Sequence, residues 1–197
     1  MNWLVITLIL LAAFGPVFWI LPSKRDRRLA KMRSRARALG MQVEMTQLPD
    51  LAAEPSARVT AGGRHREPLV ACAVYRLALP RPVRTAPHWR ILRNVANSSG
   101  PIAGWQWDSP PVGADGYWQE VETVVGALPA DALGCAAETT EVACWWRERG
   151  VAEGSESSVD ILHGAMVKLA EVQRVVDAAN RVADAEVDAD PRPHNNH

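Results

Sequence analysis

The amino-acid sequence predicts an α+β protein: one N-terminal transmembrane helix, followed by a single domain in which an antiparallel β meander is covered by a long C-terminal helix. Three observations support this fold class. An uncharged apolar run opens the chain, short apolar runs separated by Gly and Pro fill its middle, and an apolar stripe at helical spacing lies near its end. The boundaries are placed at residues 1–23 for the transmembrane helix, 24–40 for a basic juxtamembrane helix, 41–184 for the domain and 185–197 for a disordered acidic tail.

The opening apolar run covers residues 3–21, WLVITLILLAAFGPVFWIL, and carries no charge. As a helix, these nineteen residues are about 28 Å long, which matches the hydrocarbon thickness of a bilayer. A cleaved signal peptide is the alternative, but it needs basic residues before the run and a small-residue cleavage site after it. Only Met1 and Asn2 precede the run, so the sequence favours a permanent single-pass helix.

Four residues of this run have expected roles in the membrane. Trp3 and Trp19 lie near its two ends, where amphipathic rings prefer the headgroup region, so both are expected to anchor the helix. Gly15 and Pro16 interrupt the helical pattern, because proline removes a backbone donor. They predict a kink or a packing notch for another membrane helix, although proline is also tolerated in spanning helices without such a role.

The basic segment after the run is predicted to be helical as far as Gly40, with apolar residues at Leu29, Met32, Ala36 and Leu39. Basic residues mark the cytoplasmic side of a spanning helix, so the N-terminus is expected outside and the domain in the cytoplasm. Eight side chains are expected to face anionic lipid: Lys24, Arg25, Arg27, Arg28, Lys31, Arg33, Arg35 and Arg37. RNA or ribosome binding is the alternative interpretation, and no nucleic-acid ligand is expected.

The net charge of zero is the sum of opposed blocks. Residues 24–37 carry +7 and residues 94–197 carry −11, so positive charge lies beside the predicted membrane segment. Arginine outnumbers lysine 19 to 3, which is typical of GC-rich bacterial genomes and indicates a bacterial inner membrane.

Four runs in the middle of the chain have strand patterns. Residues 41–48 alternate apolar and polar positions, and residues 68–80 are apolar on both faces, as in a central strand. Residues 88–95 and 102–108 follow, with a turn cluster at residues 97–101 between them. Together they predict an antiparallel meander of three or four strands.

Three further segments complete the predicted domain. The apolar spacing over residues 118–128 indicates a short helix. Residues 133–149 fit either a helix or a hairpin, and the hairpin is favoured because Val142, Trp145 and Trp146 are strand formers. The last helix is expected to pack its apolar stripe on the sheet, although the stripe could also pair with another helix. This stripe comprises Ile161, Ala165, Leu169, Val172, Val176, Ala179 and Ala183.

Residues that could carry catalysis are few. No phosphate-binding glycine loop, nucleophile elbow, zinc-protease motif or paired-cysteine motif occurs in the sequence. Asp160 and His163 lie one helical turn apart, a spacing common for surface pairs, and His65 and His88 fall in a basic block. The sequence therefore predicts no catalytic residue, no metal, no cofactor and no small-molecule substrate, and the protein is not expected to be an enzyme.

The three cysteines are an odd number without metal-ligand spacing, which fits a reducing compartment. Cys135 and Cys144 would face each other in the hairpin and could then oxidise or bind metal. Two small buried apolar residues are the favoured interpretation.

Six tryptophans in the predicted domain are more than its two tyrosines would suggest, and most are expected in the core. Trp105 and Trp107 share one face of their strand. Exposed tryptophan near arginine is typical of protein-binding surfaces, so Trp105, Trp107 and Arg90 are the candidates for contact with a partner.

The first part of the chain resembles a known layout. The span, the segment KRDRRLAKMRSRARALGMQVEM and the later segment WWRERG are similar to small bacterial membrane proteins grouped with the YajC-like subunits of the preprotein translocase. The resemblance covers chiefly residues 3–45. It implies an N-terminal span, a basic flank and a small β-containing cytoplasmic domain.

Together, these features predict a non-catalytic accessory or interaction module, anchored on the cytoplasmic face of a bacterial inner membrane. Its expected partners are anionic lipids and another membrane protein or complex, with preprotein translocation as the most specific process. A membrane-bound enzyme of unrecognised class is the alternative.

Overall fold

The computed structural model describes residues 3, 6, 7, 23–94, 100, 102–110, 117–149 and 155–189. The predicted span over residues 3–21 therefore lies almost wholly outside the described residues, and Gly15, Pro16 and Trp19 are among those not described. Most of the predicted acidic tail lies outside them as well. Among the residues that the structure describes, no helix is both long enough and apolar enough to cross a bilayer.

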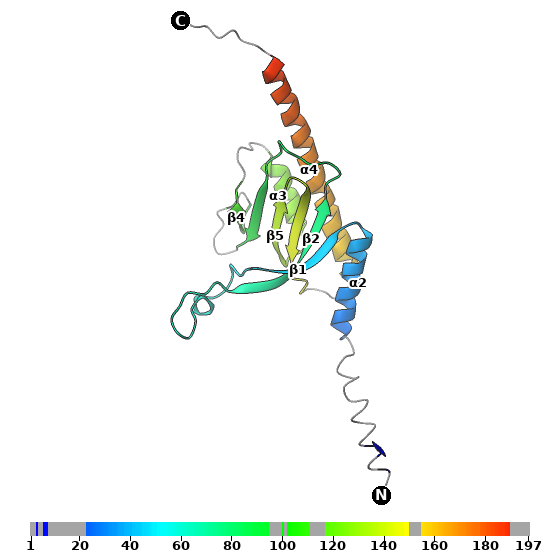
Figure 1. Cartoon of the computed structure of the whole chain (residues 1–197), viewed down its shortest axis with the longest axis vertical. Coiled ribbons are helices and arrows are strands. Elements are labelled where there is room, and N and C mark those ends of the chain that lie inside the picture. The colour runs from blue at the N-terminus through cyan, green and yellow to red at the C-terminus, as the bar shows by residue number, and fades with distance from the viewer. Residues whose placement is uncertain are drawn as a thin grey trace.

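Six strands form one antiparallel sheet, which confirms the α+β class (Figure 1). In chain order the strands are β1 (Gln42–Pro49), β2 (Leu69–Ala78), β3 (Trp89–Arg93), β4 (Trp105–Ser109), β5 (Ala132–Ala137) and β6 (Glu141–Trp146). Across the sheet their order is β1-β2-β6-β5-β3-β4, with every neighbouring pair antiparallel. The sheet is therefore not the simple meander that was predicted, because the β5–β6 hairpin lies between β2 and β3.

The position of β2 explains this order. Cys72 and Tyr75 are buried on opposite faces of β2, so the strand is suited to the interior of the sheet. After β2, Pro80 and Pro82 carry the chain off the sheet, because proline cannot donate to a strand ladder. The edge of β2 is then free to pair with β6, and the register Tyr75 to Cys144 is formed. Sequence patterns mark a strand but not its neighbour.

The predicted hairpin over residues 133–149 is confirmed as β5–β6, so this segment is not a helix. The helix predicted at residues 118–128 is confirmed as α3 (Trp118–Gly126). The other α-helices in the described residues are α2 (Lys24–Ala38) and α4 (Ser155–Ala189), and a short 3-10 helix, η1 (Pro55–Arg58), lies in the connection from β1 to β2.

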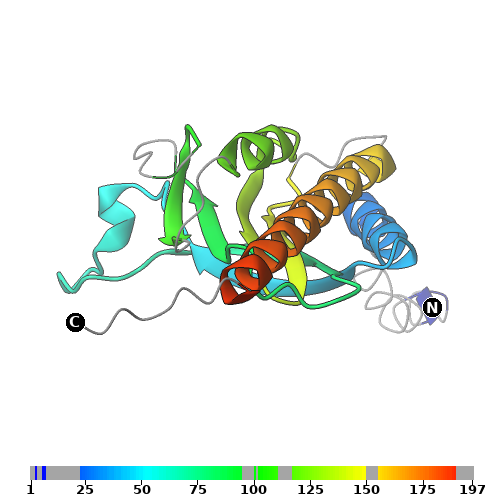
Figure 2. The same cartoon turned by 90° about the horizontal axis from the view of Figure 1, so that it is seen from above.

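These three α-helices cover one face of the sheet, as both views of the fold show (Figures 1 and 2). Their buried side chains share one hydrophobic cluster with Tyr75, Trp89, Ile91 and Trp146 of the strands. A smaller cluster on the opposite face consists of strand and strand-flanking residues: Cys72, Val74, Ala136, Ala143 and Trp145, with Leu48 and Leu133 against it. The C-terminal turns of α4 project beyond the sheet (Figure 1).

The stripe predicted for α4 is correct in part: Ala165 and Leu169 are buried and Val172 and Val176 pack on the core, whereas Ile161, Ala179 and Ala183 are exposed. Ile161 is 56% exposed, whereas the polar residues Gln173 and Asp177 are buried. Gln173 is accommodated because its Nε2 donates to the Pro87 carbonyl over 3.1 Å and contacts the Tyr117 hydroxyl at 2.6 Å. The apolar stripe did not include Gln173 and Asp177 because these two buried residues are polar and are buried through hydrogen bonds.

Candidate functional site

Helix α2, which directly follows the predicted span, is packed onto the domain. Met32 and Ala36 are fully buried against it. The helix begins with a capping box in which Ser23 Oγ accepts from the Asp26 amide and the Asp26 carboxylate accepts from Ser23. The hydrogen bonds from Ser23 hold the pKa of Asp26 below its usual value. The helix that connects the predicted span to the domain is thus ordered and docked.

A buried ion pair joins α2 to the end of β6. Arg33 Nε donates to Glu148 Oε1 over 3.0 Å, and Arg33 Nη2 donates to the second oxygen of the same carboxylate. Tyr75 Oη, from β2, also donates to Glu148 Oε1, over 2.6 Å. Glu148 is only 3% exposed, so the bidentate pair is shielded from water on the carboxylate side.

The electrostatics of this cluster follow from its burial. The hydrogen bond to Glu148 raises the pKa of Arg33 further above its already high value. Burial, and then the hydrogen bond to Glu148, raise the pKa of Tyr75 well above 10, so its hydroxyl stays protonated and donates. Arg33 and Tyr75 therefore supply the donors that compensate the buried Glu148 carboxylate.

The backbone at Glu148 is strained. Its φ of 54° lies in the left-handed region, and it is the only non-glycine residue with positive φ among the described ones. Such a conformation costs about 1 to 3 kcal/mol in a residue with a side chain and persists where the surroundings determine it. Here the carboxylate is held by Arg33 and Tyr75 at the same time.

Each residue of the segment 146–149 makes a distant polar contact. The Trp146 indole and the Arg149 amide both donate to the Asp131 carboxylate, and Arg147 pairs with Asp50 over 3.2 Å. This segment is part of the WWRERG sequence noted above. The role of Glu148 was not predicted, and the signal for it was a charged residue directly after an apolar strand.

A second, exposed ion pair links α2 to α4. Arg35 Nε lies 3.1 Å from Asp160 Oδ1, with side chains 47% and 48% exposed. Asp160 thus bonds to Arg35 rather than to His163. His65 and His88 precede and follow β2, so they lie at opposite ends of that strand and do not form a pair. In the described part of the chain, no group of three or more His, Cys, Asp or Glu side chains could hold a metal.

The eight basic residues predicted to face lipid divide into two sets. Arg33 and Arg35 bind carboxylates of the domain, because they flank the buried residues Met32 and Ala36 on either side and reach Glu148 and Asp160 respectively. Arg28 and Lys31 also take part in interactions within the protein. Within the described part of the chain, Lys24, Arg25, Arg27 and Arg37 are exposed and make no hydrogen bond to a carboxylate.

The three residues predicted to bind a partner do not form one surface. Trp105 is 4% exposed and belongs to the helix-covered core, with the Arg93 guanidinium over its ring at 5.0 Å. Trp107 is half-buried and packs edge-on against Trp118. Arg90 lies over Trp145 on the opposite face of the sheet. Core packing therefore accounts for Trp105, and only Trp107 and Arg90 keep partial exposure.

The cysteines are buried thiols. Cys135 and Cys144 are register partners in the hairpin, as predicted, and remain unbonded. Burial raises the pKa of both thiols, and that of Cys135 to about 12. The reactive thiolate is therefore disfavoured.

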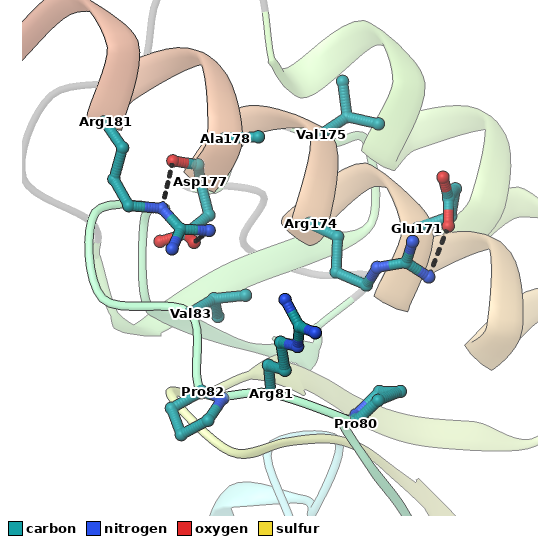
Figure 3. A pocket seen from close by; sticks show the side chains of 10 residues that line it. All are labelled: Pro80, Arg81, Pro82, Val83, Glu171, Arg174, Val175, Asp177, Ala178 and Arg181. Carbon is teal, nitrogen blue, oxygen red and sulfur yellow. Dashed lines mark hydrogen bonds and ion pairs between the residues drawn. The ribbon is translucent and has the colours of Figure 1, made fainter.

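A groove of about 480 Å³ lies between the loop after β2 and the outer half of α4 (Figure 3). Its floor includes Val83 and Ala178. Three guanidinium groups line it: Arg81 from the loop, and Arg174 and Arg181 from α4.

The carboxylates of this groove are already paired. Glu171 lies 2.9 Å from Arg174, and Asp177 lies 2.6 Å from Arg181. Arg81 has no carboxylate partner within the described ranges, and Figure 3 shows its guanidinium directed toward α4. The groove therefore has one unneutralised positive charge and two paired ones.

Asp177 fixes the loop to α4. Its Oδ1 accepts from the Arg84 amide at 2.7 Å, the Thr85 amide at 2.8 Å and the Thr85 hydroxyl at 2.9 Å. Burial alone would raise the pKa of this carboxyl, but the bonds from Thr85 and Arg84 and the charge of Arg181 outweigh it and lower the pKa. The groove is thus bounded by an ordered loop.

Comparison of the chain with protein-family models, with curated proteins and with solved structures finds no significant match.

Proposed function

We propose that this protein is a non-catalytic accessory module, anchored by its N-terminal segment on the cytoplasmic face of a bacterial inner membrane. The observation that carries the proposal is the docking of α2 through the Arg33–Glu148–Tyr75 cluster. A helix that follows the predicted span and is bound to the domain by an ion pair holds that domain at a fixed distance from the membrane and in a fixed orientation. A domain on a flexible linker would not have this property.

The exposed basic residues at the start of α2 fit the same role. Lys24, Arg25 and Arg27 are exposed and lie in the first turn of α2. Each basic residue near an anionic membrane surface contributes about 1 kcal/mol of attraction. These side chains would add lipid contacts to the anchor, while Arg33 and Arg35 hold the domain.

The groove beside α4 is the proposed surface for a protein partner. Its three arginines and apolar floor favour an acidic segment that also carries small apolar side chains. The partner is expected to be another membrane protein, because the domain is held at the membrane. Association with the preprotein translocase is the most specific form of the proposal and rests on the similarity of layout over residues 3–45.

Reporter fusions test the anchoring. A cytoplasmic reporter placed after His197 is expected to be active, and a periplasmic reporter at the same position is expected to be inactive. Activity of the periplasmic reporter alone would contradict the orientation.

Purification in mild detergent tests the groove. Wild-type protein is expected to co-purify with a partner, and Arg81→Glu is expected to reduce its recovery about tenfold through like-charge repulsion with an acidic segment. Arg64→Glu, an exposed arginine in the β1–β2 connection, is the matched control and should retain the partner. Equal recovery of the partner with both variants would exclude the groove as its binding surface. Recovery of the wild-type protein without any partner would contradict the proposal of an interaction module.

A further inference from the structure

A second pocket lies at the end of the sheet where β1, β3 and β6 finish and β2, β4 and β5 start. The pocket has a volume of about 280 Å³ and is lined by Arg93, Arg147 and Arg149 together with Asp50 and Asp131. It is separate from the groove beside α4, which lies after the opposite end of β2.

Both carboxylates in this pocket accept hydrogen bonds from the protein. Asp50 accepts from the Ala52 amide through Oδ1 at 3.2 Å and from Arg147 through Oδ2 at 3.2 Å. Asp131 accepts from the Trp146 indole through Oδ1 and from the Arg149 amide through Oδ2 at 2.8 Å. Among the described residues, Arg147 is the only one of the three arginines whose guanidinium bonds to either carboxylate.

The arginines, in contrast, have unused donors. The Nε atoms of Arg93 and Arg147 are buried and have no acceptor among the described residues. The only contact of the Arg93 guanidinium that the described residues provide is the ring of Trp105, at 5.0 Å. The exposed Arg149 side chain has no carboxylate partner in the same set. A buried donor without an acceptor costs about 1 to 3 kcal/mol, so an external acceptor is favoured here.

We infer that this pocket binds a phosphate group. Planar guanidinium groups match phosphate oxygens in geometry and charge, and several donors can act on one tetrahedral anion. Three arginines against two aspartates leave a charge of +1 in the pocket, which a phosphodiester or a singly charged phosphate monoester would balance. A cation is disfavoured because both carboxylates already hold donors.

Two sources of the phosphate fit the position of the pocket. Helix α2 begins at Lys24, after the predicted span, and packs against β1, whose last residue, Pro49, lines the pocket. A phospholipid headgroup and a soluble phosphate both carry the group that the pocket is inferred to bind. The pocket itself does not depend on the proposed anchoring.

Titrations of the full-length protein in phosphatidylcholine nanodiscs test the inference. Inorganic phosphate is added at constant ionic strength and binding is followed by calorimetry, because ionic strength alone changes surface electrostatics. In a second arm, nanodiscs contain phosphatidylglycerol, a singly charged phosphodiester lipid, and the quenching of tryptophan fluorescence by a headgroup-labelled form of that lipid is measured. Saturable binding in the first arm indicates a soluble ligand. Saturable binding in the second arm alone indicates a lipid headgroup.

Two variants decide whether the pocket is responsible. Arg149→Gln removes an exposed side chain and should leave folding intact, and Arg93→Gln removes the guanidinium over Trp105. Each is expected to weaken binding about tenfold, the loss expected for one charge-assisted hydrogen bond. Arg66→Gln, an exposed arginine in the β1–β2 connection, is the control and should bind as wild type.

Absence of saturable binding in both arms would overturn the inference. So would binding that Arg149→Gln and Arg66→Gln weaken equally, since this would indicate general electrostatic attraction. Reporter-fusion topology is independent of these results, so failure of the pocket and failure of the anchoring are distinguishable.

Discussion

Arg33 and Glu148 are separated by 115 positions in the sequence and form a bidentate ion pair that fastens α2 to the end of β6. Arg33 is 24% exposed and Glu148 is buried, so the carboxylate depends on its two donors, Arg33 and Tyr75. The pair connects the membrane-proximal helix to the sheet. It is the contact on which the proposed geometry of the protein rests.

Glu148→Ala is expected to destabilise the protein by about 3 kcal/mol, because it leaves Arg33 and the Tyr75 hydroxyl without their acceptor. Denaturant unfolding of the full-length protein in detergent, followed by tryptophan fluorescence, measures the change. Asp160→Ala is the control on the same helix interface, and loss of its exposed pair should cost about 0.5 kcal/mol or less. Equal effects of the two substitutions would contradict the importance of the buried pair.

The bonds that Asp177 accepts predict acid sensitivity of the loop after β2. The pKa of Asp177 is lower in the folded than in the unfolded protein, so its contribution is present above about pH 4 and is lost as the pH falls further. Asp177→Ala should remove this contribution and flatten the fall of stability below pH 5. Denaturant unfolding at a series of pH values measures how steeply the free energy of unfolding falls with pH in the wild type and in the variant.

Limited proteolysis gives an independent test of Asp177. The variant Asp177→Ala should be cleaved faster by trypsin after Arg84, since the Arg84 and Thr85 amides lose their acceptor. Arg81 precedes Pro82 and is a poor site for this protease, so Arg84 reports on the loop. Unchanged cleavage would show that other contacts hold the loop.

The two tyrosines predict loss of stability in alkali. Burial raises the pKa of Tyr75 and of Tyr117 in the folded protein, so both contribute stability that is present below about pH 10 and is lost above it. The ultraviolet absorbance of tyrosinate is expected to appear together with unfolding rather than before it. Ionisation of either tyrosine near pH 10 in the folded protein would contradict its burial. Tyr75→Phe should reduce the pH dependence of the free energy of unfolding in this alkaline range.

Gly134 in β5 has a steric reason to be glycine. A Cβ atom there would lie 2.9 Å from Leu92 Cδ2, 3.1 Å from Trp145 Cε3 and 3.3 Å from the Ile91 carbonyl oxygen. Gly134→Ala is therefore expected to destabilise the protein by about 1 to 3 kcal/mol. Gly164→Ala in α4 meets no atom within 4 Å and should stabilise by about 0.5 to 1 kcal/mol through helix propensity. Unfolding midpoints of the two variants should move in opposite directions.

Local patterns predicted most of the elements. The alternation of residues 41–48, the apolar run of residues 68–80 and the spacing of residues 118–128 correspond to β1, β2 and α3. These patterns are local because burial of one face sets the period of each element. The phase of α4 was predicted less well, since Gln173 and Asp177 are buried through bonds to distant loops.

The contacts of the candidate site were almost entirely unpredicted from the sequence. Nothing local indicates that Arg33 meets Glu148, that Asp177 holds the Thr85 loop or that Arg93 and Arg149 line one pocket. Each of these contacts joins residues far apart in the chain. A charged residue is predicted to lie on the surface unless its distant partner is known.

By itself, the sequence determined the α+β class, the periods of the main helices and strands, and the basic character of α2, because these depend on residues within one turn or one strand. Only the tertiary structure decided the strand order, the burial of Trp105, and the separation of Arg33 and Arg35 from the other basic residues of α2. The physical reason is that strand pairing and ion pairs depend on distances between residues remote in sequence. Chain connectivity and packing set those distances, and no local period encodes them.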